Sequence, residues 1–207
     1  MKIDSIIFDL DGTLWDSTDT VLKAWAMITE TEKDVKKPIT REEMQGSMGL
    51  QIKEIGERFF PYLDENRRLE ILEICCTEER ELLRKEGGVL FPNLERVLST
   101  LCQKYSLFIV SNCQCGYIEA FLEYHKLFCY FKDIECAGNT GLSKGENIKR
   151  VIERNGLKQP IYVGDTQGDC TGAKVAGIPF VYAAYGFGEV ESYDRKINSI
   201  EELLELV

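Results

Sequence analysis

Short apolar runs recur along the chain without the alternation of polar and apolar residues that a half-exposed strand shows. Four of them are clear, at residues 6–8, 107–110, 161–163 and 180–183, and a weaker one spans residues 133–136. Unbroken apolar runs of this length are typical of parallel strands that are covered on both faces. The pattern therefore predicts a buried parallel sheet.

Helix-length amphipathic segments separate these runs, near residues 93–104, 115–126, 145–155 and 168–176. The last of them ends at Gly177-Ile178-Pro179, which is a natural helix stop. Near the C-terminus, Ser199-Ile200-Glu201-Glu202 has the pattern of a capping box in front of a short apolar helix. Alternating strands and helices predict an α/β core, with a doubly wound, Rossmann-like parallel sheet.

Residues 15–88 show a different pattern, because they contain no convincing strand run. Long helical patterns fill residues 17–30 and 64–86, and Thr40-Arg41-Glu42-Glu43 is a second capping box. A Gly-Gly pair at 87–88, followed by Phe-Pro at 91–92, closes the segment. We predict an all-helical domain over residues 15–88, inserted into a core that comprises residues 1–14 and 89–207. We also expect it to move about linkers near residues 14–17 and 87–92.

Composition excludes several classes of protein. With 44% hydrophobic and 29% charged residues, the chain of 207 residues is too apolar to be disordered. A formal net charge of −10 is a poor match for nucleic acid or an anionic membrane. No apolar stretch reaches 18 residues, and the short apolar run near the N-terminus is flanked by Asp, so we expect no membrane span and no signal peptide. We expect a cytoplasmic protein whose eight cysteines are free thiols, since the C-x-C pair at 113 and 115 has no second pair at zinc spacing.

Polar residues follow each of the predicted strands in the part of the chain that carries chemistry. Parallel strands bring these residues to one edge of the sheet, which is where open α/β sheets bind ligands. They are Asp9, Asp11 and Gly12 after the first run, Ser111 and Asn112 after the second, Lys144 beyond the weaker run, and Asp165 and Asp169 after the run at 161–163. Taken singly, several have an ordinary interpretation: an Asp-Gly turn, a helix cap or a surface lysine.

Together these side chains suit an anionic substrate. A phosphate monoester carries about two negative charges, so attack on it requires prior neutralisation of charge. Asp9, Asp165 and Asp169 would form an all-oxygen site, which suits Mg²⁺ better than zinc. Gly12 would let the backbone come close to a ligand.

The sequence resembles the haloacid dehalogenase superfamily, and in particular its helical-cap phosphatases of the phosphoglycolate phosphatase group. The resemblance rests on four motifs in order over nearly the whole chain: Asp9-Leu10-Asp11-Gly12-Thr13, then Ser111, then Lys144, then Gly164-Asp165 with Asp169. Around the lysine, the chain reads Ser143-Lys144-Gly145 where relatives often have Gly-Lys-Pro.

The resemblance implies a role for each matched residue. Asp9 would be the nucleophile and a metal ligand, and it would form an aspartyl-phosphate. Asp11 would bind the metal through its backbone carbonyl and act as general acid and base through its side chain. Asp165 would be a direct metal ligand and Asp169 an outer one. Ser111, the Asn112 amide and Lys144 would hold the phosphoryl oxygens.

Residues 45–50 lie where related caps place a loop that faces the active site, so Ser47 and Met48 are candidates for substrate contact, although a plain helix–helix turn explains them equally well. We predict a Mg²⁺-dependent phosphatase for a small phosphorylated metabolite, as a monomer or weak homo-oligomer. A hexose-phosphate mutase of the β-phosphoglucomutase type, a pyrophosphatase or nucleotidase, and a non-catalytic phosphate-binding module are the alternatives. Product analysis would separate the phosphatase from the mutase.

Overall fold

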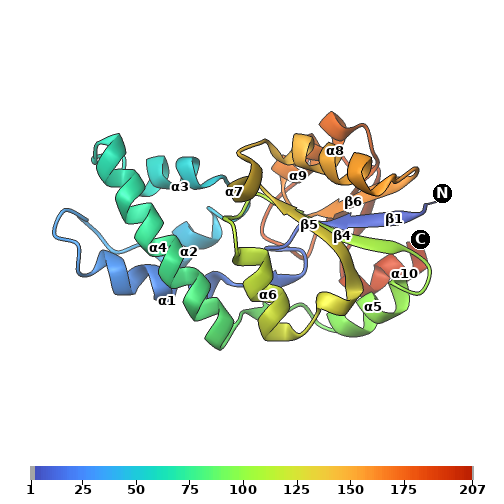
Figure 1. Cartoon of the computed structure of the whole chain (residues 1–207), viewed down its shortest axis with the longest axis horizontal. Coiled ribbons are helices and arrows are strands. Elements are labelled where there is room, and N and C mark those ends of the chain that lie inside the picture. The colour runs from blue at the N-terminus through green and yellow to red at the C-terminus, as the bar shows by residue number, and fades with distance from the viewer. Residues whose placement is uncertain (1–2, 207) are drawn as a thin grey trace.

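A six-stranded parallel sheet forms the centre of the molecule (Figure 1). The computed structural model describes residues 3–206. The strand order is β5-β4-β1-β6-β7-β8, and every neighbouring pair is parallel. The strands are β1 (Ser5–Phe8), β4 (Ser106–Ser111), β5 (Phe131–Cys136), β6 (Pro160–Gly164), β7 (Phe180–Ala183) and β8 (Arg195–Ile197). The four clear apolar runs and the weaker one are all strands, so the prediction of a parallel sheet is confirmed.

Helices cover both faces of this sheet, as its apolar strands require. Within β1, Ile6 and Phe8 pack on one face and Ile7 on the other, because successive side chains of a strand point to opposite sides. The first face lies against α5 (Leu94–Leu101), α6 (Tyr117–His125) and α10 (Leu203–Leu206), and the second against α8 (Lys144–Asn155) and α9 (Gln167–Ala176). A short helix α7 (Ala137–Thr140) and 3₁₀ turns at Phe128–Tyr130 and Ile200–Glu202 complete this part. The predicted α/β fold class, a doubly wound, Rossmann-like sheet, is confirmed.

The tail differs from its sequence prediction. Ser199 precedes the turn at Ile200–Glu202, but its side chain makes no capping hydrogen bond. Instead, the backbone N–H of Asn198 donates to Glu202 Oε2 at 2.9 Å. The predicted capping box at Ser199 is therefore wrong, because Glu202 serves the residue before it. The strand β8 was not predicted either, since two of its three residues are exposed and charged.

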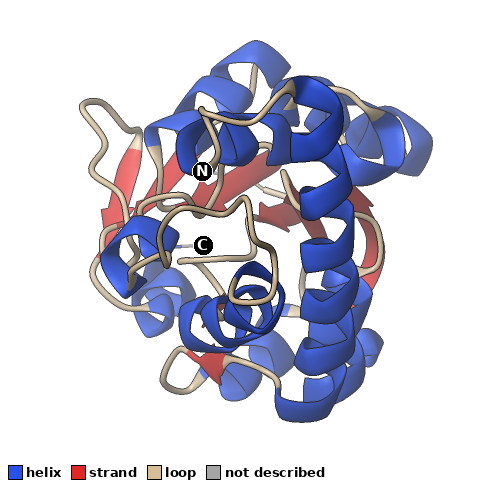
Figure 2. Cartoon of the chain, turned by 90° about the vertical axis from the view of Figure 1, so that its left-hand side faces the viewer, coloured by secondary structure: helices blue, strands red, loops and turns tan. Residues whose placement is uncertain are grey.

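Helices α1 (Thr18–Thr29), α2 (Arg41–Gln45), α3 (Ile52–Phe59) and α4 (Glu65–Glu86) stand together beyond the carboxyl ends of the strands. Figure 2 views the molecule from their side, with the strands of the sheet behind them. Trp25 of α1 joins their packing by stacking on Phe60 with ring centroids 6.5 Å apart. The capping box predicted at Thr40 is confirmed, because Thr40 and Glu43 each accept from the backbone N–H of the other.

Two short strands connect these helices to the sheet. β2 (Trp15–Asp16) and β3 (Val89–Leu90) pair antiparallel, with Trp15 opposite Leu90. The prediction of an all-helical segment over residues 15–88 is wrong at its first two residues, which form β2. A two-residue strand carries no periodic signal in the sequence. The pairing sets the outgoing and returning segments of the chain side by side.

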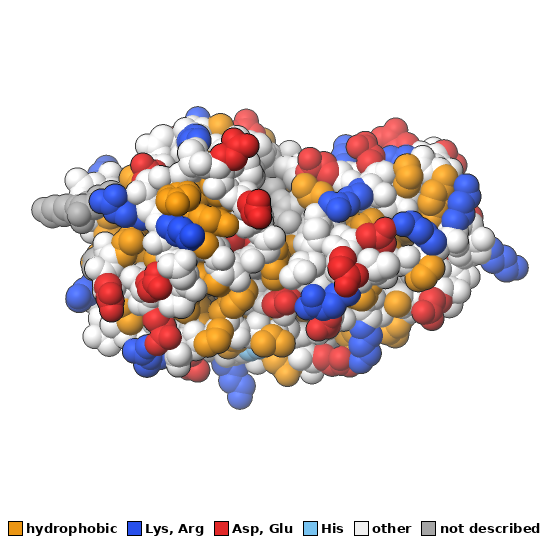
Figure 3. All heavy atoms as spheres, turned by 180° about the vertical axis from the view of Figure 1, so that it is seen from behind, with side chains coloured by type: hydrophobic (Ala, Val, Ile, Leu, Met, Phe, Trp, Pro, Cys, Tyr) orange, Lys and Arg blue, Asp and Glu red, His pale blue; other side chains and the backbone are white. Residues whose placement is uncertain are grey.

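The surface of the molecule carries acidic and basic side chains interspersed over the face in Figure 3. The cysteines at positions 75, 76, 102, 113, 115, 129, 136 and 170 are all free thiols. Among the described residues, no helix combines the length and the apolar character that crossing a membrane requires.

Candidate functional site

Three buried carboxyl groups converge at the carboxyl edge of the sheet. Asp9 follows β1, Asp165 follows β6, and Asp169 lies in the first turn of α9. One oxygen of each lies within 4.8 Å of one from each of the others, and all three residues are at most 1% exposed. The backbone N–H of Asp9 still donates to Val163 at 2.8 Å, so the sheet itself fixes the position of this side chain.

Lys144 supplies the positive charge of this cluster. It is the first residue of α8, and its Nζ lies 2.9 Å from Asp9 Oδ1 and 2.5 Å from Asp169 Oδ1. The helix begins there because Ser143 and Glu146 form a capping box. That pair fixes the start of the helix and with it the position of Lys144. Burial alone would lower the pKa of Lys144, but the negative charges of Asp169 and Asp9 outweigh it and raise the pKa.

The two oxygens of Asp169 are both used within the protein. Oδ2 accepts from the backbone N–H of Thr166 at 2.9 Å and from its hydroxyl at 2.7 Å, while Oδ1 accepts from Lys144. Asp169 therefore both caps the start of α9 and belongs to the carboxyl cluster. Because Thr166 completes this capping box, the pattern Thr166-Gln167-Gly168-Asp169 could have shown its role in the sequence.

Asp11 points away from the carboxyl cluster. Its Oδ1 accepts from Ser17 Oγ at 2.7 Å and from Tyr117 Oη at 3.0 Å. Burial raises the pKa of Asp11, and these two hydrogen bonds oppose the rise. The side chain is therefore separate from the carboxyl groups of Asp9, Asp165 and Asp169.

The backbone around Asp165 approaches very closely. Gly12 has φ +75°, and a Cβ added to it would lie 2.2 Å from Asp165 Oδ2. A Cβ on Gly186 would lie 2.3 Å from the Cβ of Asp165. Only glycine fits at either position, and the sequence indicated this for Gly12 but not for Gly186.

The predicted phosphate-binding residues lie at the end of β4 and in the turn after it. Ser111 Oγ accepts from the backbone N–H of Cys113 at 3.3 Å. Asn112 Nδ2 donates to the backbone carbonyl of Gly49 at 2.8 Å, which ties the sheet edge to the helical part of the chain. Its Oδ1 is buried and has no partner among the described residues.

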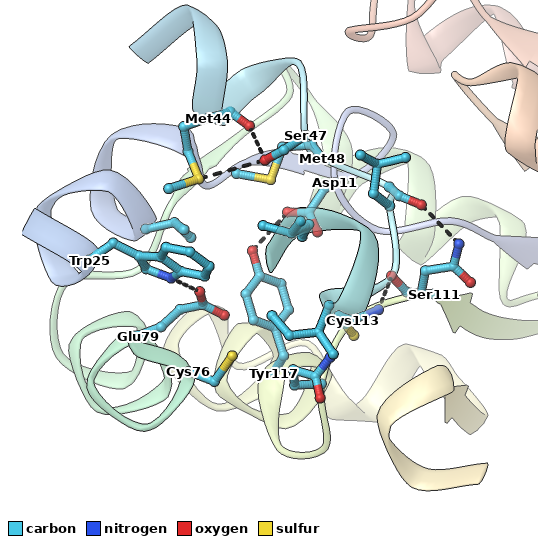
Figure 4. A pocket seen from close by; sticks show the side chains of 17 residues that line it. Asp11, Trp25, Met44, Ser47, Met48, Cys76, Glu79, Ser111, Cys113 and Tyr117 are labelled. Carbon is cyan, nitrogen blue, oxygen red and sulfur yellow. Dashed lines mark hydrogen bonds between the residues drawn. The ribbon is translucent and has the colours of Figure 1, made fainter. Parts of the chain in front are cut away.

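A cavity of about 50 Å³ separates the sheet edge from the helices (Figure 4). The sheet edge contributes Asp11, Ser111 and Asn112 to its wall. Ser47 and Met48 line it from the opposite side, where the sequence placed them, but the Ser47 hydroxyl already donates to the carbonyl of Met44 at 2.6 Å. The sequence indicated neither Tyr117 nor Glu79 as a wall residue.

The carboxyl cluster fits a divalent cation. Its members are crowded: burial and the charge of Asp169 raise the pKa of Asp165 to about 7, and burial together with the same charge raises the pKa of Asp9. Lys144 is the one cation that faces them, and it leaves Asp9 Oδ2 buried without a partner among the described residues. Hard cations such as Mg²⁺ take oxygen ligands of this kind. Asp9 and Asp165 would hold it, with the backbone carbonyl of Asp11 beside them.

Comparison with known proteins gives a consistent result. Residues 6–183 match the family described as haloacid dehalogenase-like hydrolase. The phosphoglycolate phosphatase of Escherichia coli K12 is 27% identical, covering 98% of this chain and 91% of its own. A haloacid dehalogenase-like hydrolase from Streptococcus pneumoniae superposes with a TM-score of 0.85 at 25% identity, covering 99% of this chain and 98% of its own. CbbY from Rhodobacter sphaeroides, in complex with xylulose 1,5-bisphosphate, shares the fold, with a TM-score of 0.79 at 17% identity and coverage of 98% and 96%.

Proposed function

This chain belongs to the haloacid dehalogenase-like hydrolases, and we propose that this phosphatase depends on Mg²⁺ and hydrolyses a small phosphorylated metabolite through an aspartyl-phosphate. The observation that carries the proposal is the unpartnered, buried Oδ2 of Asp9 beside Asp165. A carboxylate held there by Lys144 through one oxygen keeps the other available for attack or for a metal.

In the first chemical step, a carboxylate oxygen of Asp9 attacks the phosphorus, and the bond from phosphorus to the leaving oxygen breaks. Asp11 gives its proton to that oxygen, so the leaving group departs as an alcohol. In the second step, water attacks the phosphorus, gives its proton to Asp11, and releases Asp9. Bound Mg²⁺ would supply charge neutralisation on the phosphoryl oxygens, to which Lys144, Ser111 and the Asn112 amide would also contribute.

We further propose that residues 15–88 act as a cap over this site. The cavity of about 50 Å³ is far below the volume of roughly 300 Å³ or more that ligand pockets have. Admission of a substrate therefore requires α1–α4 to move away from the sheet edge. The β2–β3 pair gathers both connections at one place, which suits a hinge.

Phosphate release from alkyl and aryl phosphoesters, with and without Mg²⁺, tests the proposal. Asp9→Asn should abolish release from both. Asp11→Asn should lose hydrolysis of alkyl esters. With an aryl ester it should give a burst of one equivalent of aryl alcohol, because an activated leaving group needs no proton. The phosphoenzyme then accumulates. Turnover by Asp9→Asn at the wild-type rate, or an equal loss for both ester types in Asp11→Asn without a burst, would contradict the mechanism.

A further inference from the structure

Glu79 of α4 is a buried carboxyl group in the wall of the cavity, on the side opposite the sheet edge. Its side chain is only 6% exposed. Trp25 Nε1 donates to its Oε2 at 2.5 Å, and among the described residues no hydrogen bond reaches Oε1 (Figure 4). The mechanism proposed above makes no use of this group.

The other residues of the cavity wall give Glu79 no cation to pair with. Among the described residues, the wall contains a second carboxyl group, Asp11, and no lysine, arginine or histidine. The neighbouring Arg80 lines an adjacent cavity, which shares Ile52, Cys76 and Gln114 with this one, and not the wall around Glu79. The aromatic side chains of Trp25 and Tyr117 also line the wall. Carboxyl groups together with aromatic rings are the surroundings that favour an organic cation.

These surroundings oppose a substrate whose leaving group carries a carboxylate. Such a group would enter a largely water-free space beside the Glu79 carboxyl group, whose ionised form would repel it, and none of the described wall residues carries a positive charge. A leaving group with an ammonium would instead donate to Glu79 Oε1 and form an ion pair with the ionised carboxylate. A neutral hydroxyl could satisfy Oε1, but it would form no ion pair with Glu79.

We propose that Glu79 selects the substrate, and that the substrate is the phosphate ester of a small amino alcohol whose protonated amine binds Glu79. This inference rests on the proposed phosphatase function and specifies its substrate class. Glu79 would be a binding residue that contacts the leaving group, while the phosphoryl chemistry stays at Asp9 and Asp11.

The protonation of the free protein agrees with this role. Burial raises the pKa of Glu79 to about 8, against the hydrogen bond from Trp25, so the carboxyl group is mostly neutral at pH 7 before a ligand binds. A cation in the cavity would stabilise the ionised form and release the proton to solvent. The empty cavity therefore avoids the cost of a buried, unpaired charge.

The test compares kcat/KM of the Mg²⁺-loaded protein for four esters: phosphoethanolamine, glycerol 3-phosphate, phosphoglycolate and p-nitrophenyl phosphate. We expect kcat/KM for phosphoethanolamine to exceed that for phosphoglycolate by about 100-fold or more. The buried charge of the first ester is paired, whereas that of the second is repelled. Glu79→Gln should reduce that ratio by about tenfold or more. The matched control is Glu73→Gln, which removes an exposed charge from the same helix and should keep the wild-type ratio.

The outcomes separate this inference from the proposed function. Hydrolysis of p-nitrophenyl phosphate, combined with a preference for phosphoglycolate or for glycerol 3-phosphate over phosphoethanolamine, would overturn the substrate class and leave the phosphatase intact. Absence of hydrolysis of all four esters would overturn the proposed function and the inference with it. If Glu79→Gln does not fold, the wild-type ranking of the esters still tests the substrate class. The variant Glu79→Asp keeps the charge but shortens the side chain, and it should retain the preference for the amine at a higher KM.

Discussion

The hydroxyl of Tyr117 lies 3.0 Å from Oδ1 of Asp11, across a separation of 106 residues along the chain. Ser17 reaches the same oxygen, and its Oγ lies 2.8 Å from the tyrosine oxygen. The three side chains form a buried triangle between the sheet edge and the start of α1. Two donors on one oxygen fix the rotation of the Asp11 carboxyl group, so its other oxygen has a defined direction for proton exchange.

Tyr117→Phe removes one of these donors and should lower kcat for alkyl phosphoesters by about tenfold, which is roughly 1.4 kcal/mol of activation free energy. The phenyl ring keeps its edge contact with Trp15, where the centroids lie 5.9 Å apart, so the fold should remain intact. Because Tyr117 acts through Asp11 as a positioning residue, the first release of aryl alcohol from an activated ester, which needs no proton from Asp11, should be largely kept. The control is Tyr124→Phe, on the same helix with a 40% exposed side chain. Equal losses for alkyl and aryl esters would contradict this role.

Mg²⁺ should raise the thermal stability of protein first treated with EDTA. A ligand that binds only the folded state at 100 times its Kd adds about 2.7 kcal/mol, and the crowded carboxyl groups of Asp9 and Asp165 would form such a site under our proposal. We expect Tm to rise by several degrees in millimolar MgCl₂ but not in NaCl of the same ionic strength. Asp165→Asn should remove the shift. An unchanged shift in that variant would place the ion elsewhere.

Gly12→Ala should destabilise the protein and abolish activity. The added Cβ would meet Asp165 Oδ2 at 2.2 Å, in a loop whose φ of +75° already disfavours any side chain. The left-handed backbone alone costs about 1–2 kcal/mol. Gly156→Ala is the matched control, because its φ is +65° and nothing lies within 4 Å of the added Cβ. Urea unfolding should show a loss of about 1 kcal/mol for the control and a clearly larger one for Gly12→Ala; equal losses would show that the contact with Asp165 has no cost.

The sequence predicts the sheet well because parallel strands covered on both faces need continuous apolar runs. Since such strands end at one edge, the position of Asp9, Lys144 and Asp165 also follows from the order of the runs. The exposed strand β8 has no such signature, since the sequence reads Arg195-Lys196-Ile197 there. The local sequence pattern therefore predicts the strands that are buried along their whole length, and it misses short strands at the edge of the sheet.

The walls of the cavity were not predictable for a different reason. Glu79 lies in a helix rich in glutamate, where Glu78 and Glu81 look the same in the sequence. Only the packing of α1 against α4, which brings Trp25 over it, makes Glu79 the buried member. Tyr117 likewise reads as one aromatic residue of an amphipathic helix. The cavity wall is formed by side chains from residues 15–88 and from the rest of the chain. Which of them meet there depends on tertiary packing, which the local sequence pattern does not reveal.

The buried carboxyl of Glu79 should make the stability of the metal-free protein fall as pH rises. In the unfolded chain this group releases its proton near pH 4.5, whereas in the folded protein burial raises its pKa to about 8. The charge of Asp11 adds to this rise, while Trp25 and the charge of Arg80 oppose it. Between these two values the folded state holds a proton that the unfolded state has lost. The favourable difference is therefore fully present below pH 4.5 and is lost as pH rises toward 8.

Glu79→Gln keeps the shape of this side chain and removes its titration. Relative to the wild type, the variant should therefore gain about 2–4 kcal/mol in free energy of unfolding between pH 5 and pH 8, since one proton is worth about 1.4 kcal/mol per pH unit. Urea denaturation in EDTA at four pH values measures this difference, in which the titrations of all other groups cancel. Glu73→Gln, which removes an exposed carboxyl of the same helix, should run parallel to the wild type. Parallel profiles for Glu79→Gln as well would show that the folded carboxyl titrates like an exposed one, with no cost of burial.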